Sequence, residues 1–458
     1  MKTNCKLLVI LFFFVGFFWE EPIYLKAQNR ILTLEESLKM AQTNGSLAKQ
    51  YRYAHEAATQ GIQLQKANYW PTLQFLANVS HANEAPRIPV EFENDTVLAR
   101  QGTQDTFISR FELTQMLYDF GKTSHAVEAA RYQAESVDAD YKHQNIGLNN
   151  QVREEFYKSL YYQKLDSIYS AIIPFSEELA TISKVRIDNG VALSPEVLKS
   201  QVDLQDLLAQ HASAQNEYRK ALVQLAYLTG QPNIDFSTKG RLPGVPETKN
   251  LSMYYPSMYQ LALAHRADIN QLVSQSKQQA ELAKSIDALK YPTLTLQSDF
   301  SYFGPDAFGY YSGLSSRGLN PVNWRVGIGF TFTLFNGFRI RTQKNQSLAL
   351  NKQYQEQVYQ LKQQISSQIQ MLLKDLESLR VLKQSNELLL SQINASIKIM
   401  ETSYANGNIP RLEYIKAIIP KATAEANLQK TRSDIAQVLV KLQTTIGTDI
   451  STIWQKNE

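Results

Sequence analysis

Residues 324–334 read WRVGIGFTFTL, and every second residue from Trp324 to Leu334 is apolar. Successive side chains of a β-strand point to opposite faces, so this stretch would place all its apolar residues on one face and Arg325 on the other. A weaker version of the same alternation runs from Phe107 to Leu117. The sequence therefore predicts strands with one strongly apolar face.

The end of this strand is one of several landmarks that occur twice. Leu117-Tyr118-Asp119 is echoed by Leu334-Phe335-Asn336, with a glycine close behind each. The same shift of 217 residues carries Asn189-Gly190 onto Asn406-Gly407 and Gly230 onto Gly447. Landmarks that share one offset indicate a duplicated unit rather than three unrelated domains.

Each copy has the order helix, strand, strand, long helical hairpin. The first repeat is predicted over 28–230, with a helix at 32–69, strands at 72–80 and 106–119, and a hairpin at 121–228 whose tip is near 189–194. The second repeat is predicted over 257–447, with a helix at 257–290, strands at 293–303 and 323–336, and a hairpin at 337–446 whose tip is near 405–410. A linker at 231–256 joins the two repeats, and a tail follows at 448–458.

The hairpin helices are too long for an ordinary globular domain. At about 1.5 Å per residue, a helix from Gly121 to Asn189 would extend roughly 100 Å. In the second copy, apolar residues between Tyr354 and Leu379 recur at steps of three and four. This spacing predicts a coiled coil.

The amino terminus predicts export. Lys2 and Lys6 precede an apolar run from Leu7 to Trp19, which is too short to span a membrane and typical of a signal peptide, here assigned to 1–27. The single cysteine, Cys5, lies within that segment. We therefore expect no N-terminal lipidation and no thiol chemistry in the mature chain.

Composition excludes several classes of protein. A mean hydropathy of -0.32 argues against a bundle of transmembrane helices. The net charge of +4 is spread along the chain without a basic run, so nucleic acid is not an expected partner. The six histidines are scattered and no nucleotide-binding or nucleophile motif stands in its required context, so we expect no enzyme, no metal and no cofactor.

Four apolar-faced strands cannot close a membrane barrel alone. Open strand edges in lipid would leave backbone groups unpaired, so such strands must share a barrel with other copies of the chain. The strands alone also fit a soluble sandwich. The alternative to a membrane pore is a periplasmic coiled-coil scaffold or adhesin.

The ordered set of Pro-Thr-Leu strand openings, Tyr-Asp-Phe-Gly and Phe-Asn-Gly strand ends and Asn-Gly helix tips resembles TolC-type outer-membrane efflux proteins. This resemblance implies a mainly α fold in which a trimeric twelve-stranded β-barrel, with four strands from each chain, continues into a long α-helical coiled-coil tunnel. It also implies a location in the outer membrane, contact with its lipid, and a tunnel in the periplasm. The function implied is a passive exit duct of a tripartite efflux or type I secretion system. Its partners would be a periplasmic adaptor protein and an inner-membrane pump of the resistance-nodulation-division or ABC type.

The resemblance also assigns site residues. The adaptor would dock on the hairpin tips at Asn189, Gly190, Val191, Asn406, Gly407 and Asn408. The periplasmic gate would use Glu196, Tyr404, Glu413 and Lys416. Glu413 matches the first of two gate acids, whereas the second position holds Lys416. Glu196 would hold the gate shut by pairing with Tyr404, although Glu196 also suits a helix start after Ser194 and Pro195, and the tip glycines also suit tight turns.

Overall fold

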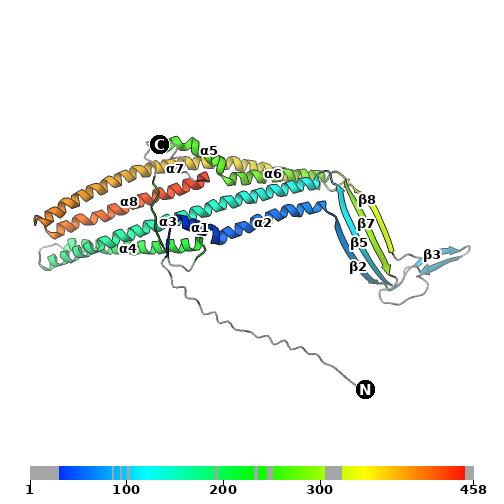
Figure 1. Cartoon of the computed structure of the whole chain (residues 1–458), viewed down its shortest axis with the longest axis horizontal. Helices are drawn as coiled ribbons and strands as arrows, with labels where there is room; N and C mark the ends of the chain where they lie inside the picture. The colour runs from blue at the N-terminus through cyan, green and yellow to red at the C-terminus, as the bar shows by residue number, and fades with distance from the viewer. Residues whose placement is uncertain are drawn as a thin grey trace, which may run out of the picture.

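The computed structural model describes residues 30–84, 87–92, 95–100, 104–190, 194–231, 236–244, 251–304 and 322–448. The predicted signal peptide and residues 449–458 of the predicted tail lie outside this part. Within it, the molecule is a bundle of long helices with a four-stranded sheet at one end (Figure 1). No helix of the described residues is long and apolar enough to cross a membrane.

The first repeat begins with a short strand and a helix that is broken. After β1 (Arg30–Leu32), α1 (Leu34–Asn44) starts at a capping box in which the Thr33 side chain accepts from Glu36 N–H and the Glu36 carboxylate accepts from Thr33 N–H. Helix α2 (Ser46–Lys66) and a short 3₁₀ turn, Ala67–Tyr69, follow. The prediction of a single helix over 32–69 is therefore wrong in one respect, because Gly45 has an extended backbone and separates two helices.

The second repeat has the same break at the equivalent position. Helix α5 (Tyr255–His265) and α6 (Ala267–Ala288) replace the single helix predicted over 257–290, and Arg266 between them is extended. Each break faces the glycine that ends the returning hairpin helix of its own repeat. A Cβ on Gly230 would lie 2.6 Å from the Asn44 carbonyl oxygen, and one on Gly447 would lie 3.2 Å from that of His265.

Both repeats contribute to one antiparallel sheet. Its order is β2 (Thr72–His81), β5 (Asp105–Tyr118), β7 (Thr293–Gly304) and β8 (Val322–Thr331). The strand predicted over 323–336 ends earlier, at Thr331. That residue pairs with Thr293, the first residue of β7, and Pro292 before it has no N–H to continue the ladder.

The segment between the first two predicted strands holds a further β-hairpin. Strands β3 (Arg87–Phe92) and β4 (Asp95–Arg100) pair antiparallel there and form a sheet of their own. The predicted linker also contains regular structure, since β6 (Phe236–Thr238) pairs parallel with β1 and a 3₁₀ turn spans Leu251–Tyr254.

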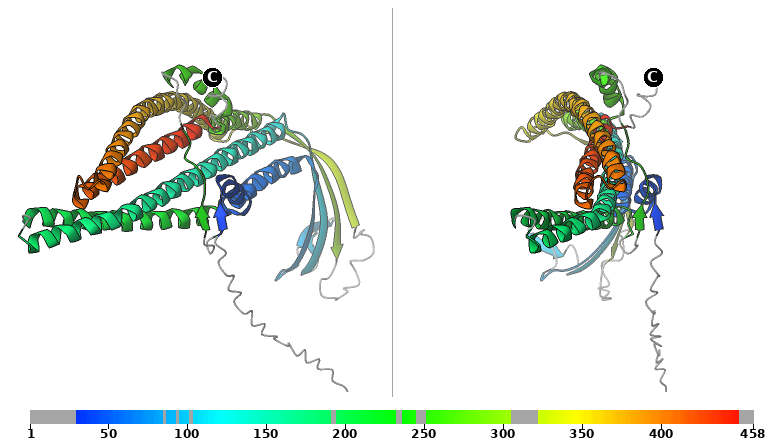
Figure 2. Two further views of the ribbon diagram at one scale, coloured as in Figure 1. Left: turned by 60° about the vertical axis from the view of Figure 1, so that its left-hand side comes forward. Right: turned by 90° about the vertical axis from the view of Figure 1, so that its left-hand side faces the viewer.

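Two long hairpins form the helical body. The first consists of α3 (Lys122–Asp188) and α4 (Ser194–Leu228), the second of α7 (Arg339–Ala405) and α8 (Arg411–Ile446). Ile365, Ile369 and Leu376 on the predicted seam of α7 are fully buried in the core cluster, where α8 also contributes residues. Both hairpin tips lie at the end opposite the sheet, as Figures 1 and 2 show.

Sharp turns join the sheet to the long helices. Asp119 accepts hydrogen bonds from the backbone N–H of Thr123 at 2.7 Å and of Gly121 at 3.2 Å, which caps the start of α3. Phe120 and Phe338 have φ of 53° and 62°, beside Gly121 and Gly337 with φ of 90° and 65°. A bulky side chain rarely adopts this conformation, so both turns store strain.

Candidate gate at the helical tips

The two hairpins are joined near their tips by one Arg–Glu pair. Arg411, the first residue of α8, donates from Nε to Glu178 Oε1 at 2.8 Å and from Nη2 to Oε2 at 2.9 Å. Glu178 lies on α3, so the pair links the second repeat to the first. The hydrogen bond from Arg411 lowers the pKa of the Glu178 carboxyl, and the same bond raises the pKa of Arg411.

Two tyrosines complete this group. The rings of Tyr404 and Tyr414 stack at 5.4 Å between centroids with 3° between their planes. The Arg411 guanidinium lies 5.5 Å from the first ring centroid and 5.4 Å from the second. Cations are attracted to aromatic faces at this distance. We call Glu178, Tyr404, Arg411 and Tyr414 the tip cluster, and it connects the end of α7, the start of α8 and the side of α3.

Glu413 and Lys416 pair with each other within α8. Lys416 Nζ lies 3.5 Å from Glu413 Oε1, and both side chains are exposed. Each chain therefore offers one carboxylate and one ammonium at these positions.

The turns at the tips require their glycines. Gly190 and Gly407 have φ of 69° and 75°, and a Cβ on either would meet nothing within 4 Å. After α7, Gly407 N–H donates to the Tyr404 carbonyl and Asn408 N–H to the Ser403 carbonyl, both at 2.9 Å. This pair of backbone hydrogen bonds is a Schellman motif. Asn189 closes its turn with a side-chain hydrogen bond to the Val185 carbonyl at 2.9 Å.

Two of the predicted site residues cannot be placed. Val191 lies outside the described residues, and so does the side chain of Glu196, whose backbone belongs to α4. The expected pairing of Glu196 with Tyr404 therefore stays a prediction. Glu178, Arg411 and Tyr414 were not expected at this site. The only sequence signal for them is that Arg411 and Tyr414 lie close to Glu413, because Glu178 belongs to the other repeat.

The sheet has two chemically different faces. The strand register aligns Phe75, Phe111, Phe300 and Trp324 in one row across the four strands, and all four are exposed. The neighbouring row on the opposite face aligns Gln74, Glu112, Asp299 and Arg325. On that face Arg325 Nε donates to Asp299 Oδ1 at 2.9 Å, and Arg110 Nη1 donates to Glu112 Oε1 at 2.8 Å.

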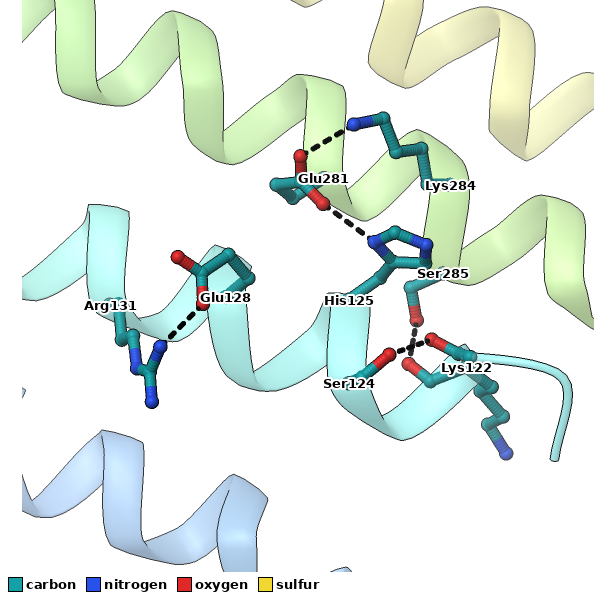
Figure 3. A network of polar contacts seen from close by, with 9 residues as sticks. Lys122, Ser124, His125, Glu128, Arg131, Glu281, Lys284 and Ser285 are labelled. Atoms are coloured by element: carbon teal, nitrogen blue, oxygen red, sulfur yellow. Dashed lines mark hydrogen bonds and ion pairs between the residues drawn. The ribbon is translucent and has the colours of Figure 1, made fainter. Parts of the chain in front are cut away.

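Polar contacts also tie α3 to α6 where the helices leave the sheet (Figure 3). Glu281 on α6 accepts from Lys284 Nζ and contacts His125 Nδ1, both at 2.7 Å, and Ser285 Oγ donates to the Lys122 carbonyl at 2.9 Å. Burial raises the pKa of Glu281, but the bonds from Lys284 and His125 outweigh it and the net pKa is lowered.

One Ser, His and Asp set occurs on the first hairpin, but its geometry does not support catalysis. Ser170 Oγ at 3.1 Å and Asp166 Oδ1 at 2.8 Å both contact the same ring nitrogen of His211, Nε2. A proton relay needs the acid and the hydroxyl on opposite nitrogens. In the part of the chain that the structure describes, no three His, Cys, Asp or Glu residues are grouped to hold a metal.

Comparison with known proteins finds the same fold in solved outer membrane channels. It is similar in fold to the Campylobacter jejuni CmeC outer membrane channel, with a TM-score of 0.74, 15% identity, and coverage of 93% of this chain and 88% of that one. The Neisseria gonorrhoeae MtrE outer membrane channel, solved in its open state, gives a TM-score of 0.68 at 15% identity, with 91% and 89% covered. By sequence the chain is 21% identical over 420 residues to nodulation protein T of Rhizobium leguminosarum bv. trifolii, covering 86% of this chain and 84% of that protein.

The duplicated order of strands and long helical hairpins is the fold of the outer membrane channels compared above. The family model described as "Outer membrane efflux protein" matches residues 26–231 and 258–448. The chain belongs to this family and is a TolC-like channel component of the outer membrane.

Proposed function

We propose that this protein is the passive exit duct of a tripartite efflux or type I secretion system. Three chains form a closed twelve-stranded barrel and a helical tunnel. A periplasmic adaptor opens the tunnel at its tip, and an inner-membrane pump supplies the substrate and the energy.

The edges of the sheet support the trimer. Among the strands that the structure describes, β2 and β8 at the edges of the four-stranded sheet each have a partner on one side only. Exposed backbone groups on an edge need a partner in lipid, which the β2 and β8 edges of neighbouring copies supply to each other. Long helix α7 also exposes Val381, Leu388 and Ile399, each at least 60% accessible in the single chain. Neighbouring chains would cover these side chains.

The two faces of the sheet support the orientation of the barrel. The row from Phe75 to Trp324 suits lipid, and the charged row that includes Arg325 suits a water-filled lumen. Aromatic residues near the strand ends suit the membrane interfaces. Tyr69, Trp70, Tyr118, Phe120, Tyr291 and Phe335 are all exposed in the single chain.

The tip cluster supports the gate. Its Arg411–Glu178 pair holds one hairpin against the other, so separating the hairpins breaks two charge-assisted hydrogen bonds in each chain. The adaptor would reach this region through the tips at Asn189, Gly190, Val191, Asn406, Gly407 and Asn408. Glu413 and Lys416 would form a ring of paired charges rather than a ring of carboxylates.

The bidentate contact between Arg411 and Glu178 is the main observation that supports a gate at the helical tips. The proposal is tested with full-length protein purified in detergent and reconstituted into planar bilayers. We expect a heat-modifiable trimer whose conductance is nearly closed and rises when the tip cluster is broken. A monomer without conductance, in the wild type and in every tip variant, would instead favour a scaffold without a pore.

A further inference from the structure

A cavity of about 780 Å³ lies on the helical body where the segment between the two repeats crosses the long helices. Its walls come from α3, α7, α8 and residues 240–244 of that segment. Four lining residues are basic, namely Lys164, Arg241, Lys383 and Arg432, and none of the lining residues is acidic. Each basic residue belongs to a different wall, so the fold itself gathers this charge.

Only part of the charge is neutralised. Glu387 on α7 lies 3.1 Å from Arg432 Nη2 and 3.7 Å from Lys383 Nζ, and it serves both cations. Among the residues that the structure describes, Lys164 and Arg241 have no ion-pair partner. Four cations against one carboxylate leave a clear positive excess at the cavity.

The wall formed by the connecting segment is held in place. A Cβ on Gly240 would lie 3.1 Å from Phe156 Cε1, so the backbone rests directly on α3. Just before it, the buried Ser159 hydroxyl donates to Thr238 Oγ1 at 2.9 Å. Just after Arg241, Leu242 packs against the adjoining hydrophobic core. The Arg241 backbone is therefore fixed on both sides by contacts within the chain.

We propose that this cavity binds a soluble, phosphate-bearing small molecule. Its volume falls in the range of about 300–1,000 Å³ that is usual for small-molecule sites. A phosphate monoester carries roughly −1.5 to −2 charges at neutral pH, which matches the positive excess better than a single carboxylate does. Guanidinium groups such as those of Arg241 and Arg432 bind phosphate oxygens in pairs. Leu160, Leu242 and Ile435 supply an apolar wall for the rest of the molecule.

The position of the cavity selects a soluble ligand over a lipid headgroup. Leu160 belongs to the lining, and α3 starts beside the sheet at Lys122. At about 1.5 Å per residue, these two residues are roughly 57 Å apart along the helix axis. Lipid around the sheet is therefore out of reach. The inference goes beyond the exit-duct proposal and does not depend on whether the tunnel conducts.

The test is calorimetric titration of the full-length protein in detergent with inorganic pyrophosphate. We expect saturable binding with one site per chain, weakened at least tenfold by Arg241→Gln and by Lys164→Gln. Both side chains are exposed, so folding should survive, and Arg241→Lys should recover part of the affinity. Lys352→Gln, which removes an exposed charge from α7 outside the cavity, is the matched control and should bind like the wild type.

Several outcomes would overturn the proposal. These are no saturable binding at millimolar pyrophosphate, equal weakening by Lys352→Gln, or unchanged affinity in both cavity variants. Citrate binding as tightly as pyrophosphate would contradict the preference for phosphate. Competition by vesicles of a phosphate-headgroup lipid would contradict the soluble source. Since none of these readouts is a conductance, failure here leaves the exit-duct proposal standing.

Discussion

Arg411 and Glu178 are 233 positions apart in the chain and form a bidentate ion pair at 2.8 and 2.9 Å. Arg411 also lies over the stacked rings of Tyr404 and Tyr414. A single guanidinium therefore contacts both helices of its own hairpin and one helix of the other. Glu413, one of the acids predicted for the gate, pairs instead with Lys416 of its own helix.

Arg411→Gln should raise the open fraction in planar bilayers. Exposed ion pairs contribute about 0.2–1 kcal/mol each, so losing one in each of three chains should raise the open-to-closed ratio severalfold. Glu178→Gln should act in the same direction. Arg131→Gln is the control, because Arg131 pairs with Glu128 at 2.8 Å within α3, and among the described residues no ion pair joins it to a second helix. If the Arg411→Gln channel stays as closed as the wild type, the Arg411–Glu178 pair does not hold the gate shut.

Acid should open the wild-type channel. The pKa of Glu178 is lowered in the folded protein, mainly by its hydrogen bond from Arg411. The pair is therefore fully formed above the ordinary carboxyl pKa of 4.5 and is lost as the pH falls through the lowered value. Conductance should stay low from pH 7 to about 4.5 and rise below it. Glu178→Gln should already have a raised open fraction at neutral pH and should lose most of this response. If Glu178→Gln responds to acid in the same way as the wild type, the response comes from other carboxyls, such as Glu281.

Two substitutions at Tyr404 separate the ring from the hydroxyl. The observed contacts of Tyr404 are the stack on Tyr414 and the guanidinium of Arg411, and phenylalanine would keep both. Tyr404→Phe should therefore stay nearly closed, while Tyr404→Leu should raise the open fraction. If the phenylalanine variant opens as much as the leucine variant, the hydroxyl carries the effect. The pairing with Glu196 would then be the stronger explanation.

The strained turn at Phe338 gives a prediction about stability. A left-handed conformation costs a residue with a Cβ roughly 1–2 kcal/mol. Phe338→Ala loses the ring contact with Phe335 and keeps the strain, whereas Phe338→Gly loses the contact and relieves the strain. The glycine variant should thus be about 1 kcal/mol more stable than the alanine variant. Thermal dissociation of the purified trimer measures this difference. If the alanine variant is as stable as the glycine variant, or more stable, the backbone at Phe338 is not strained.

The repeat and the strand pattern could be predicted from sequence because they are local. The alternation around Trp324 places Arg325 on the face opposite the apolar row, and the structure agrees. The break between α1 and α2 had one local signal, Gly45, but Arg266 at the equivalent break has none. The extended backbone there is set by contact with the end of α8, where Arg266 Nη1 donates to the Thr445 carbonyl at 3.0 Å.

The tip cluster was less predictable, because it depends on contacts between residues that are far apart in the sequence. Glu413 and Tyr404 could be proposed from their distance to the tip glycine in the sequence. The partner of Arg411 could not, because Glu178 meets it only after both hairpins have packed. The β3–β4 hairpin did have a signal, since the apolar residues Ile88, Val90 and Phe92 alternate with other residues between the first two predicted strands.

Gly230 and Gly190 form a matched pair for the last prediction. Their φ values are 71° and 69°, so alanine at either position meets the same backbone strain of roughly 1–2 kcal/mol. They differ in space, since a Cβ on Gly230 would lie 2.6 Å from the Asn44 carbonyl oxygen while one on Gly190 would meet nothing within 4 Å. Displacing that backbone adds an overpacking cost, so Gly230→Ala should destabilise the protein by about 3 kcal/mol or more in total. Denaturant unfolding of the purified chain should show the larger loss for Gly230→Ala. Equal losses would mean that the break at Gly45 can shift freely away from the end of α4, and that the contact repeated at Gly447 and His265 does not fix the geometry of the two repeats.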